Sequence, residues 1–154
     1  MIQTIEIKNP KQKQEIANKI LRQLPEWFSI ESAIKDYVSK VRKQLFFAVK
    51  DNNQVIGFIS VKENNSFVAE IEVMGVIKDY QLKGVGQSLI LAAEKILKKR
   101  KIKFLLVKTL SENKRDKYYE KTRKFYLKNG FIPIFESNKI WDKQNPCVIM
   151  IKNL

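Results

Sequence analysis

The chain has 154 residues and a formal net charge of +14, with 44% hydrophobic and 30% charged residues. These fractions are ordinary for globular proteins and exclude a disordered or fibrous chain, and we expect residues 1–154 to form a single domain with one sizeable core. No apolar run approaches the ~20 residues of a membrane span, and the N-terminus has no apolar signal segment. We therefore expect a cytoplasmic protein that does not enter a membrane.

The chain contains no histidine and a single cysteine, Cys147. The absence of histidine excludes Ser-His-Asp and Cys-His catalytic arrangements. Zinc prefers His and Cys ligands, so we expect no metal site. Cys147 cannot form an intrachain disulfide, which agrees with a reducing compartment. It lies in the last predicted strand with no base beside it, and we interpret it as a small buried hydrophobe rather than an acyl carrier.

The first half of the chain predicts one strand, two helices and a three-strand meander. Residues 2–7 alternate apolar and polar and predict a strand. Asn9 as the cap and Pro10 in the first helical position begin a helix that runs toward Pro25. A second helix begins near Ser29 or Ser32. Turn signals at residues 51–53 and 64–66 then separate three predicted strands, at residues 45–50, 55–62 and 67–76.

The second half predicts two helices that alternate with shorter strands. Residues 87–100 have a helical apolar stripe without Gly or Pro, and residues 117–128 form a second helix that ends at Asn129-Gly130. Strands are predicted at residues 103–110, 131–135 and 148–151. The order β α α β β β α β α β β indicates an α+β (mixed α/β) fold built around one sheet.

One short segment, Gln81-Leu82-Lys83-Gly84-Val85-Gly86, lies between a predicted strand and a predicted helix. The N-terminus of a helix offers backbone N–H groups without internal partners and the positive end of the helix dipole, and both favour a phosphate or pyrophosphate. The two glycines allow a ligand to approach the backbone, and Gln81 and Lys83 can add polar contacts. The segment does not match the Walker A or the Rossmann phosphate-binding motif. Taken alone, its pair of glycines also fits an ordinary turn.

In this context the segment resembles the acetyl-CoA pyrophosphate loop of the GNAT N-acetyltransferase family, Q/R-x-x-G-x-G/A after the fourth strand. Gln81, Gly84 and Gly86 occupy its three fixed positions, whereas Leu82 stands where many members have glycine. The resemblance implies the GNAT fold, a mostly antiparallel sheet of about seven strands flanked by four helices.

A second GNAT signature, an aromatic residue and a tyrosine in the penultimate helix followed by Gly-Phe, is matched by Phe125-Tyr126 and Gly130-Phe131. Tyr119 and Thr122 depart from the family, in which other members have Asn and Ala.

The resemblance implies an acetyl-CoA-dependent N-acetyltransferase that passes the acetyl group directly to an amine of a small molecule or peptide in a ternary complex. Acetyl-CoA would lie between the fourth and fifth strands, and a backbone N–H near Val76 would hold the oxyanion. The implied cofactor contacts are Met74, Gly75, Val76, Gln81, Leu82, Lys83, Gly84, Val85, Gly86, Gln87, Tyr119 and Tyr126.

The reaction needs a base, because an alkylammonium of pKa near ~10 must lose a proton before it attacks a thioester. Without histidine the candidates are Glu70 and Glu72, on the strand that leads into the loop. Regular alternation places both on one face with Met74 and Val76. Glu70 is the first choice, because it resembles the position of the base in histone-type GNAT members. A strand bulge would change the faces, and the glutamates would then face solvent or bind a substrate cation.

The reaction also needs an acid, because the departing thiolate must be protonated. Tyr126 is the candidate, since a phenol of pKa near ~10 can protonate a thiolate of similar basicity, and the resemblance places the family's tyrosine there. The alternative is a tyrosine that only packs in the core.

Four more aromatic residues either contact the acceptor or belong to the core: Trp27, Phe28, Tyr37 and Trp141.

The positive charge is concentrated in residues 95–128, which have fourteen Lys or Arg and three acidic residues. Such a patch attracts polyanions, including nucleic acid and coenzyme A, or it is a solubilising surface. Two alternatives to the enzyme therefore stay open: a catalytically silent acyl-CoA-binding module and a basic nucleic-acid-binding domain. We favour acetyl-CoA and an amine acceptor as partners over nucleic acid, and we leave a homodimer open.

Overall fold

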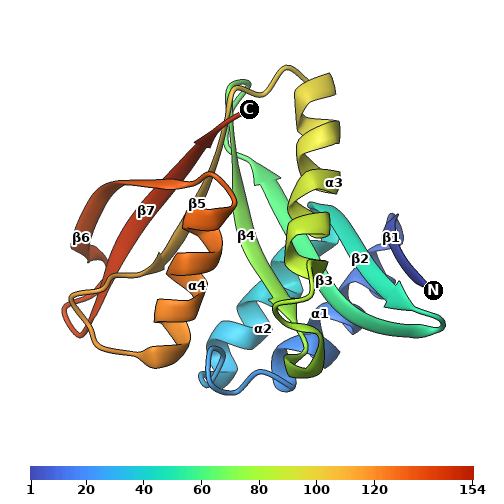
Figure 1. Ribbon diagram of the computed structural model, residues 1–154, viewed down its shortest axis with the longest axis horizontal. Coiled ribbons are helices and arrows are strands. Elements are labelled where there is room, and N and C mark those ends of the chain that lie inside the picture. The colour runs from blue at the N-terminus through green and yellow to red at the C-terminus, as the bar shows by residue number, and fades with distance from the viewer.

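The computed structural model describes residues 1–154 and contains one seven-stranded sheet with four α-helices around it (Figure 1). The strands follow the spatial order β1-β2-β3-β4-β5-β7-β6. This confirms the predicted mixed α+β class with its seven strands and four helices. The elements are β1 (Ile2–Glu6), α1 (Pro10–Arg22), α2 (Glu31–Lys40), β2 (Leu45–Asp51), β3 (Gln54–Glu63), β4 (Val68–Val76), α3 (Val85–Lys99), β5 (Phe104–Leu110), α4 (Lys117–Lys128), β6 (Ile132–Asp142) and β7 (Asn145–Asn153).

Side-chain caps fix where two of the helices begin. The Asn9 side chain accepts a hydrogen bond from the Gln12 N–H at 3.0 Å, and Pro10 occupies the first turn of α1, as predicted. At α4 the Asp116 carboxylate accepts from the backbone N–H groups of Tyr118 and Tyr119 at 2.9 and 3.1 Å. The helix α3 has no such cap, and Gly84 precedes it in a left-handed conformation.

The last hairpin is longer than predicted. Strand β6 covers Ile132–Asp142 and β7 covers Asn145–Asn153, whereas the sequence indicated only 131–135 and 148–151. The edge strand β6 is exposed along most of its length, so its residues lack the apolar alternation that marks a half-buried strand. Helix α3 also begins two residues earlier than predicted, at Val85.

Helices cover both faces of the sheet. Gly75 on β4 packs against α1, where an added Cβ would lie 3.2 Å from Ile20 Cγ2. Gly57 on β3 packs against α3, where a Cβ would lie 3.3 Å from Val85 Cγ1. The hydrophobic core contains 32 buried residues, among them the stacked rings of Phe46 and Phe58, whose centroids are 5.2 Å apart. No helix combines the length and apolar character that crossing a membrane requires.

Strands β4 and β5 pair only at their beginnings. The parallel ladder joins Val68–Ile71 to Phe104–Val107 and then stops. Beyond it β4 runs on to Val76, while β5 continues beside β7 as far as Leu110. The two strands therefore diverge, as Figure 1 shows in the lower half of the view. The second half of β4 has a strand neighbour only on its β3 side.

A β-bulge at Glu72 sets which side chains of β4 face which helices. Ser60 of β3 is opposite Val73 and Val61 is opposite Ile71, so Glu72 is the extra residue. Glu70 and Glu72 consequently lie on the face covered by α1 and α2, where Glu72 meets Lys40 of α2.

Val76 lies on the opposite face, since its side chain borders the Cβ position of Gly57 beside α3, and Met74 shares that face by alternation. The prediction that both glutamates share a face with Met74 and Val76 was therefore wrong. The reason is that the extra residue at the bulge reverses the alternation of the strand.

Candidate active site

The predicted phosphate loop connects the end of β4 to the start of α3. The Gln81 side chain turns back and donates a hydrogen bond from Nε2 to the Val76 carbonyl at 2.9 Å, which fixes the loop to the strand. Leu82 and Gly84 both adopt positive φ angles, 60° and 83°. The Leu82 side chain is fully exposed and packs against nothing. The left-handed backbone at these two positions shapes the loop.

The start of α3 presents unpartnered hydrogen-bond donors. No carbonyl or side chain of the protein accepts from the backbone N–H groups of Gly84, Val85, Gly86 and Gln87. The first turn contains no acidic residue and no capping side chain. A Cβ added at Gly84 would meet no atom within 4 Å, so the backbone is open there. Free donors together with the positive end of the helix dipole make this segment suited to an anion such as a pyrophosphate.

Helix α4 packs directly against this loop. A Cβ at Gly86 would lie 2.7 Å from Cζ of Phe125, so only glycine lets the ring approach this closely. The Arg123 guanidinium also donates to the Leu110 carbonyl at 2.7 Å, which ties α4 to the end of β5. The two sequence signatures, far apart in the chain, are therefore in contact.

Tyr126 lies behind Phe125 in a buried aromatic cluster. Its ring packs edge-on against Phe125 and Phe131, each with a centroid distance of 5.3 Å. Burial raises the pKa of Tyr126 far above its ordinary value, and the nearby phenols of Tyr119 and Tyr37 add to the shift. The phenol is therefore protonated at neutral pH.

Tyr119, predicted to contact the cofactor, holds the segment between α1 and α2 in place. Its hydroxyl donates to the Trp27 carbonyl at 2.8 Å, and burial raises the pKa of Tyr119 to about 12. The Trp27 indole N–H in turn donates to Thr122 Oγ1 at 3.0 Å. The two departures from the GNAT signature, Tyr119 and Thr122, thus both bind the backbone or side chain of Trp27. Sequence reasoning missed this contact, because nothing local connects residues about 95 positions apart.

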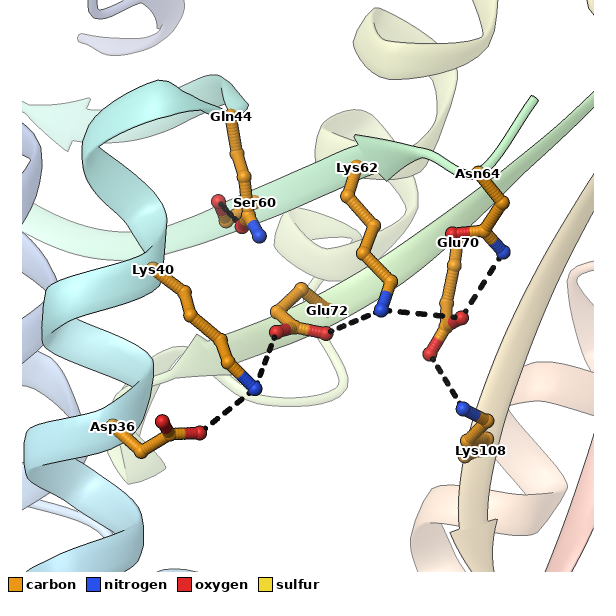
Figure 2. Close-up of polar contacts among 9 residues, drawn as sticks. All are labelled: Asp36, Lys40, Gln44, Ser60, Lys62, Asn64, Glu70, Glu72 and Lys108. Atoms are coloured by element: carbon orange, nitrogen blue, oxygen red, sulfur yellow. Dashed lines mark hydrogen bonds and ion pairs between the residues drawn. The ribbon is translucent and has the colours of Figure 1, made fainter. Parts of the chain in front are cut away.

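Glu70 and Glu72 form a charged network with three lysines (Figure 2). Both carboxylate side chains are 7% exposed. Lys62 lies between them, 3.8 Å from Glu70 Oε1 and 3.6 Å from Glu72 Oε2. Lys108 is 3.5 Å from Glu70 Oε2, and Lys40 is 3.5 Å from Glu72 Oε1.

The lysines come from three different elements, α2, β3 and β5, and sequence reasoning missed all of them. Lys62 could have been found, since it is directly opposite Glu70 in the antiparallel β3–β4 register. Lys40 and Lys108 could not, because they reach the glutamates only through tertiary packing. Asn64 adds a hydrogen bond from its side-chain amide to Glu70 Oε1 at 3.2 Å. Glu72 Oε1 is buried and accepts no hydrogen bond.

Tyr37 of α2 joins this network to the aromatic cluster. Burial raises the pKa of Tyr37, and the carboxylate of Glu72 raises it further. The same phenol contributes to the pKa shifts of Tyr119 and Tyr126. Side chains from α2, β4 and α4 therefore converge where β4 separates from β5. Cys147 lies nearby, fully buried as predicted, and burial raises the pKa of its thiol to about 11.

The sequence model of the acetyltransferase (GNAT) family matches residues 12–131, which include the loop, both glutamates and Tyr126. The chain belongs to the GNAT family. A search of curated protein sequences gives no match to this GNAT protein.

Solved GNAT structures share its fold over nearly the whole chain. A protein from Desulfovibrio desulfuricans assigned to the GNAT family has a TM-score of 0.84 at 12% identity, with 99% of each chain covered. The ribosomal-protein-S18-alanine N-acetyltransferase of Escherichia coli has a TM-score of 0.78 at 17% identity, covering 99% of this chain and 94% of its own. The PaiA N-acetyltransferase of Thermoplasma acidophilum, solved with coenzyme A, has a TM-score of 0.76 at 20% identity. The match covers 100% of this chain and 99% of the PaiA chain.

The contact between Gly86 and Phe125 gives a test of the loop's construction. We expect Gly86→Ala to lower the free energy of unfolding by about 1–2 kcal/mol, because the overpacking penalty exceeds the roughly 1 kcal/mol by which alanine favours a helix. Urea unfolding measures the change. In a Phe125→Leu background the same substitution should be neutral or stabilising. Gly84→Asn, at an open left-handed position, is the control and should change stability little. A fully tolerated Gly86→Ala in the parent would show that the close packing is not required.

Proposed function

We propose that this GNAT protein transfers the acetyl group of acetyl-CoA directly to an amine in a ternary complex. One arrangement carries the proposal: β4 leads from the carboxylates of Glu70 and Glu72, whose side chains are 7% exposed, toward the unpartnered N–H groups at the start of α3. The strand that carries the acid–base groups thus leads into the phosphate site, and Gly84 follows Glu72 by 12 positions in the chain. Family membership supports acetyl transfer, and the arrangement supports an amine as the acceptor.

The loop and the free edge of β4 are suited to acetyl-CoA. The pyrophosphate would lie on the backbone N–H groups of residues 83–87, with the Lys83 ammonium near its outer oxygens. The pantetheine arm would follow Met74, Gly75 and Val76, where β4 has lost its pairing with β5. A strand edge without a partner offers main-chain donors and acceptors, which the amide groups of the arm can use. One such N–H near Val76 would hold the oxyanion.

The chemistry assigns proton transfers to both ends of the site. Glu70, or Glu72, accepts a proton from the acceptor ammonium directly or through a water. The free amine attacks the thioester carbonyl and forms a tetrahedral oxyanion with a positively charged nitrogen. The C–S bond breaks, the thiolate takes a proton from Tyr126, and the nitrogen returns a proton to the Tyr126 phenolate through a water, which leaves the amide. Burial raises the pKa of Tyr126 and makes its phenol a weaker acid than a free tyrosine. A thiolate that leaves into the same buried cluster becomes a stronger base by the same desolvation, so the two groups stay matched for the transfer.

One observation favours a second candidate, a catalytically silent acyl-CoA-binding module. Glu70 and Glu72 already neutralise lysine side chains, so their charges are used in the protein as it stands. Such a module would bind acetyl-CoA without releasing its thiol. Thiol release across a panel of amines therefore separates the two candidates.

Acetyl-CoA should raise the Tm of the protein. At a ligand concentration about 100 times Kd the stabilisation should be about 2.7 kcal/mol. Gly84→Glu should abolish the increase, because a carboxylate would lie where the pyrophosphate binds. Gly84→Asn has no added charge and should retain most of it, each variant being compared with its own ligand-free Tm. An unchanged Tm in the parent protein at millimolar ligand would contradict the proposal.

Glu70→Gln should reduce thiol release at about pH 7 by 10²-fold or more, because the acceptor loses its base. The reduction should become smaller toward about pH 9.5, where a growing fraction of the amine is already deprotonated. Initial rates with a simple primary amine measure both effects. Glu72→Gln is the matched variant, and the larger loss identifies the base. Equal rates for the parent and Glu70→Gln would remove Glu70 from the mechanism.

Tyr126→Phe should lower kcat while the KM for acetyl-CoA changes little, because the phenol acts only when the thiolate leaves. Tyr118→Phe, a tyrosine on the same helix whose ring packs on Trp27, serves as the control and should keep the parent kcat. An unchanged kcat in Tyr126→Phe would assign the residue to packing alone.

A further inference from the structure

A basic cleft lies next to the two glutamates, on the face of the sheet covered by α1 and α2. It has a volume of about 1080 Å³ and is lined by the ends of β1, β2 and β3, the segment after α2, and the C-terminal end of α3. Seven lysine and arginine side chains border it, against the two carboxylates of Glu6 and Glu63. Glu63 is paired with Arg100 at 3.2 Å, and Lys40 and Lys62 are paired with Glu70 and Glu72. The remaining charges of the cleft are still mainly positive: Lys8, Lys13, Arg42 and Lys43 against Glu6.

The cleft is continuous with the proposed acid–base site, because two lysines belong to both. Lys40 and Lys62 line the cleft and also contact Glu72, which Figure 2 shows between them. An acceptor whose amine reaches Glu70 and Glu72 from this side must therefore pass along the cleft or leave part of its structure there.

Part of the cleft is fixed by internal contacts. The buried Lys13 ammonium donates to the Gln44 carbonyl at 2.6 Å and to the Arg42 carbonyl at 3.4 Å, and burial lowers the pKa of Lys13. These bonds hold the backbone of the segment after α2. The Arg42 and Lys43 side chains on that segment line the cleft, and no carboxylate of the protein pairs with either of them. They are free to bind an anion.

The charges around the glutamates disfavour an acceptor with several ammonium groups. Three lysine ammonium groups are within 4 Å of the two carboxylates. A second or third cation on the acceptor would meet these lysines and the cleft beyond them, and like charges in proximity oppose binding. A single ammonium would have to compete with only one lysine for an acceptor atom. Glu72 Oε1, for example, accepts no hydrogen bond and is approached by Lys40 at 3.5 Å.

We propose that the acceptor is an amine carried by an acidic molecule. This inference rests on the proposed N-acetyltransferase function. The ammonium binds against Glu70 or Glu72 in place of one of their lysines, and carboxylate or phosphate groups of the same molecule bind in the basic cleft against Arg42 and Lys43. Selectivity comes from both parts of the site. The basic cleft attracts the acidic part of the acceptor, and the lysines bound to Glu70 and Glu72 repel a polycation.

The test is thiol release from acetyl-CoA with short amidated peptides that offer only an N-terminal amine. Ala-Ala-Ala, Ala-Glu-Glu and Ala-Arg-Arg vary the charge at constant length, and Ala-phosphoSer-phosphoSer separates phosphate from carboxylate recognition. Spermidine adds a polycationic amine. We expect kcat/KM for Ala-Glu-Glu or the phosphopeptide to exceed that for Ala-Arg-Arg by at least about tenfold, with the difference shrinking as salt is added.

Lys43→Glu should reduce the preference for acidic peptides, and it leaves the glutamates and the loop untouched. Lys95→Glu, an exposed residue of α3 on the other face of the sheet, makes the same charge change and should leave the preference intact. Any of three results would overturn the inference: equal rates for all peptides, a preference for Ala-Arg-Arg or spermidine, or an unchanged preference for acidic peptides in Lys43→Glu. A different outcome would be that acetyl-CoA raises the Tm but none of these amines gives thiol release above the rate of acetyl-CoA hydrolysis. In that case the proposed transfer reaction is wrong, and this inference fails with it.

Discussion

The course of β4 is the constraint on which the site depends. The strand begins in a parallel pair with β5, gains an extra residue at Glu72, and then continues with a partner only on its β3 side. The bulge places two carboxylates on the face of α1 and α2, and it leaves Val76 on the face of α3, beside the loop. A regular strand would place these residues differently, so the bulge distributes the acid–base groups and the loop to two sides of one backbone.

A second constraint is the approach of α4 to the start of α3. Gly86 allows the Phe125 ring to lie against the loop, and the Arg123 guanidinium fixes the helix to the end of β5. Tyr126 is thereby held over the region where the strands diverge. Tyr119 connects the same helix to Trp27, so the segment between α1 and α2 is part of the same assembly. Residues from both halves of the chain must therefore fold together before the site exists, and its geometry depends on the whole core.

The electrostatics of the site differ from those of a carboxylate left alone in a protein interior. Removing a carboxylate from water is expensive unless a cation or hydrogen-bond donors compensate it. Here Lys62 is shared by both glutamates, and Lys40 and Lys108 each serve one of them. The protein thus carries its own counterions at the place where an acceptor ammonium would bind. An incoming cation has to compete with them, which makes the charge of the acceptor a determinant of selectivity.

The sequence by itself determined the element order, the cap of α1, the end of α4 at Asn129-Gly130, and the glycine loop before α3. Propensity, capping and turn-forming residues are encoded within a few neighbouring positions, so these features can be predicted locally. It also indicated Glu70 and Glu72 as candidates, through the absence of histidine and their place on the strand before the loop, and Tyr126 through the family signature. The sequence did not determine the bulge at Glu72, the lysines around the two glutamates, the Gly86–Phe125 contact or the bonds to Trp27. These depend on strand register and on packing between segments far apart in the chain, and no local pattern records which residues such packing brings together. Only the tertiary structure decided them.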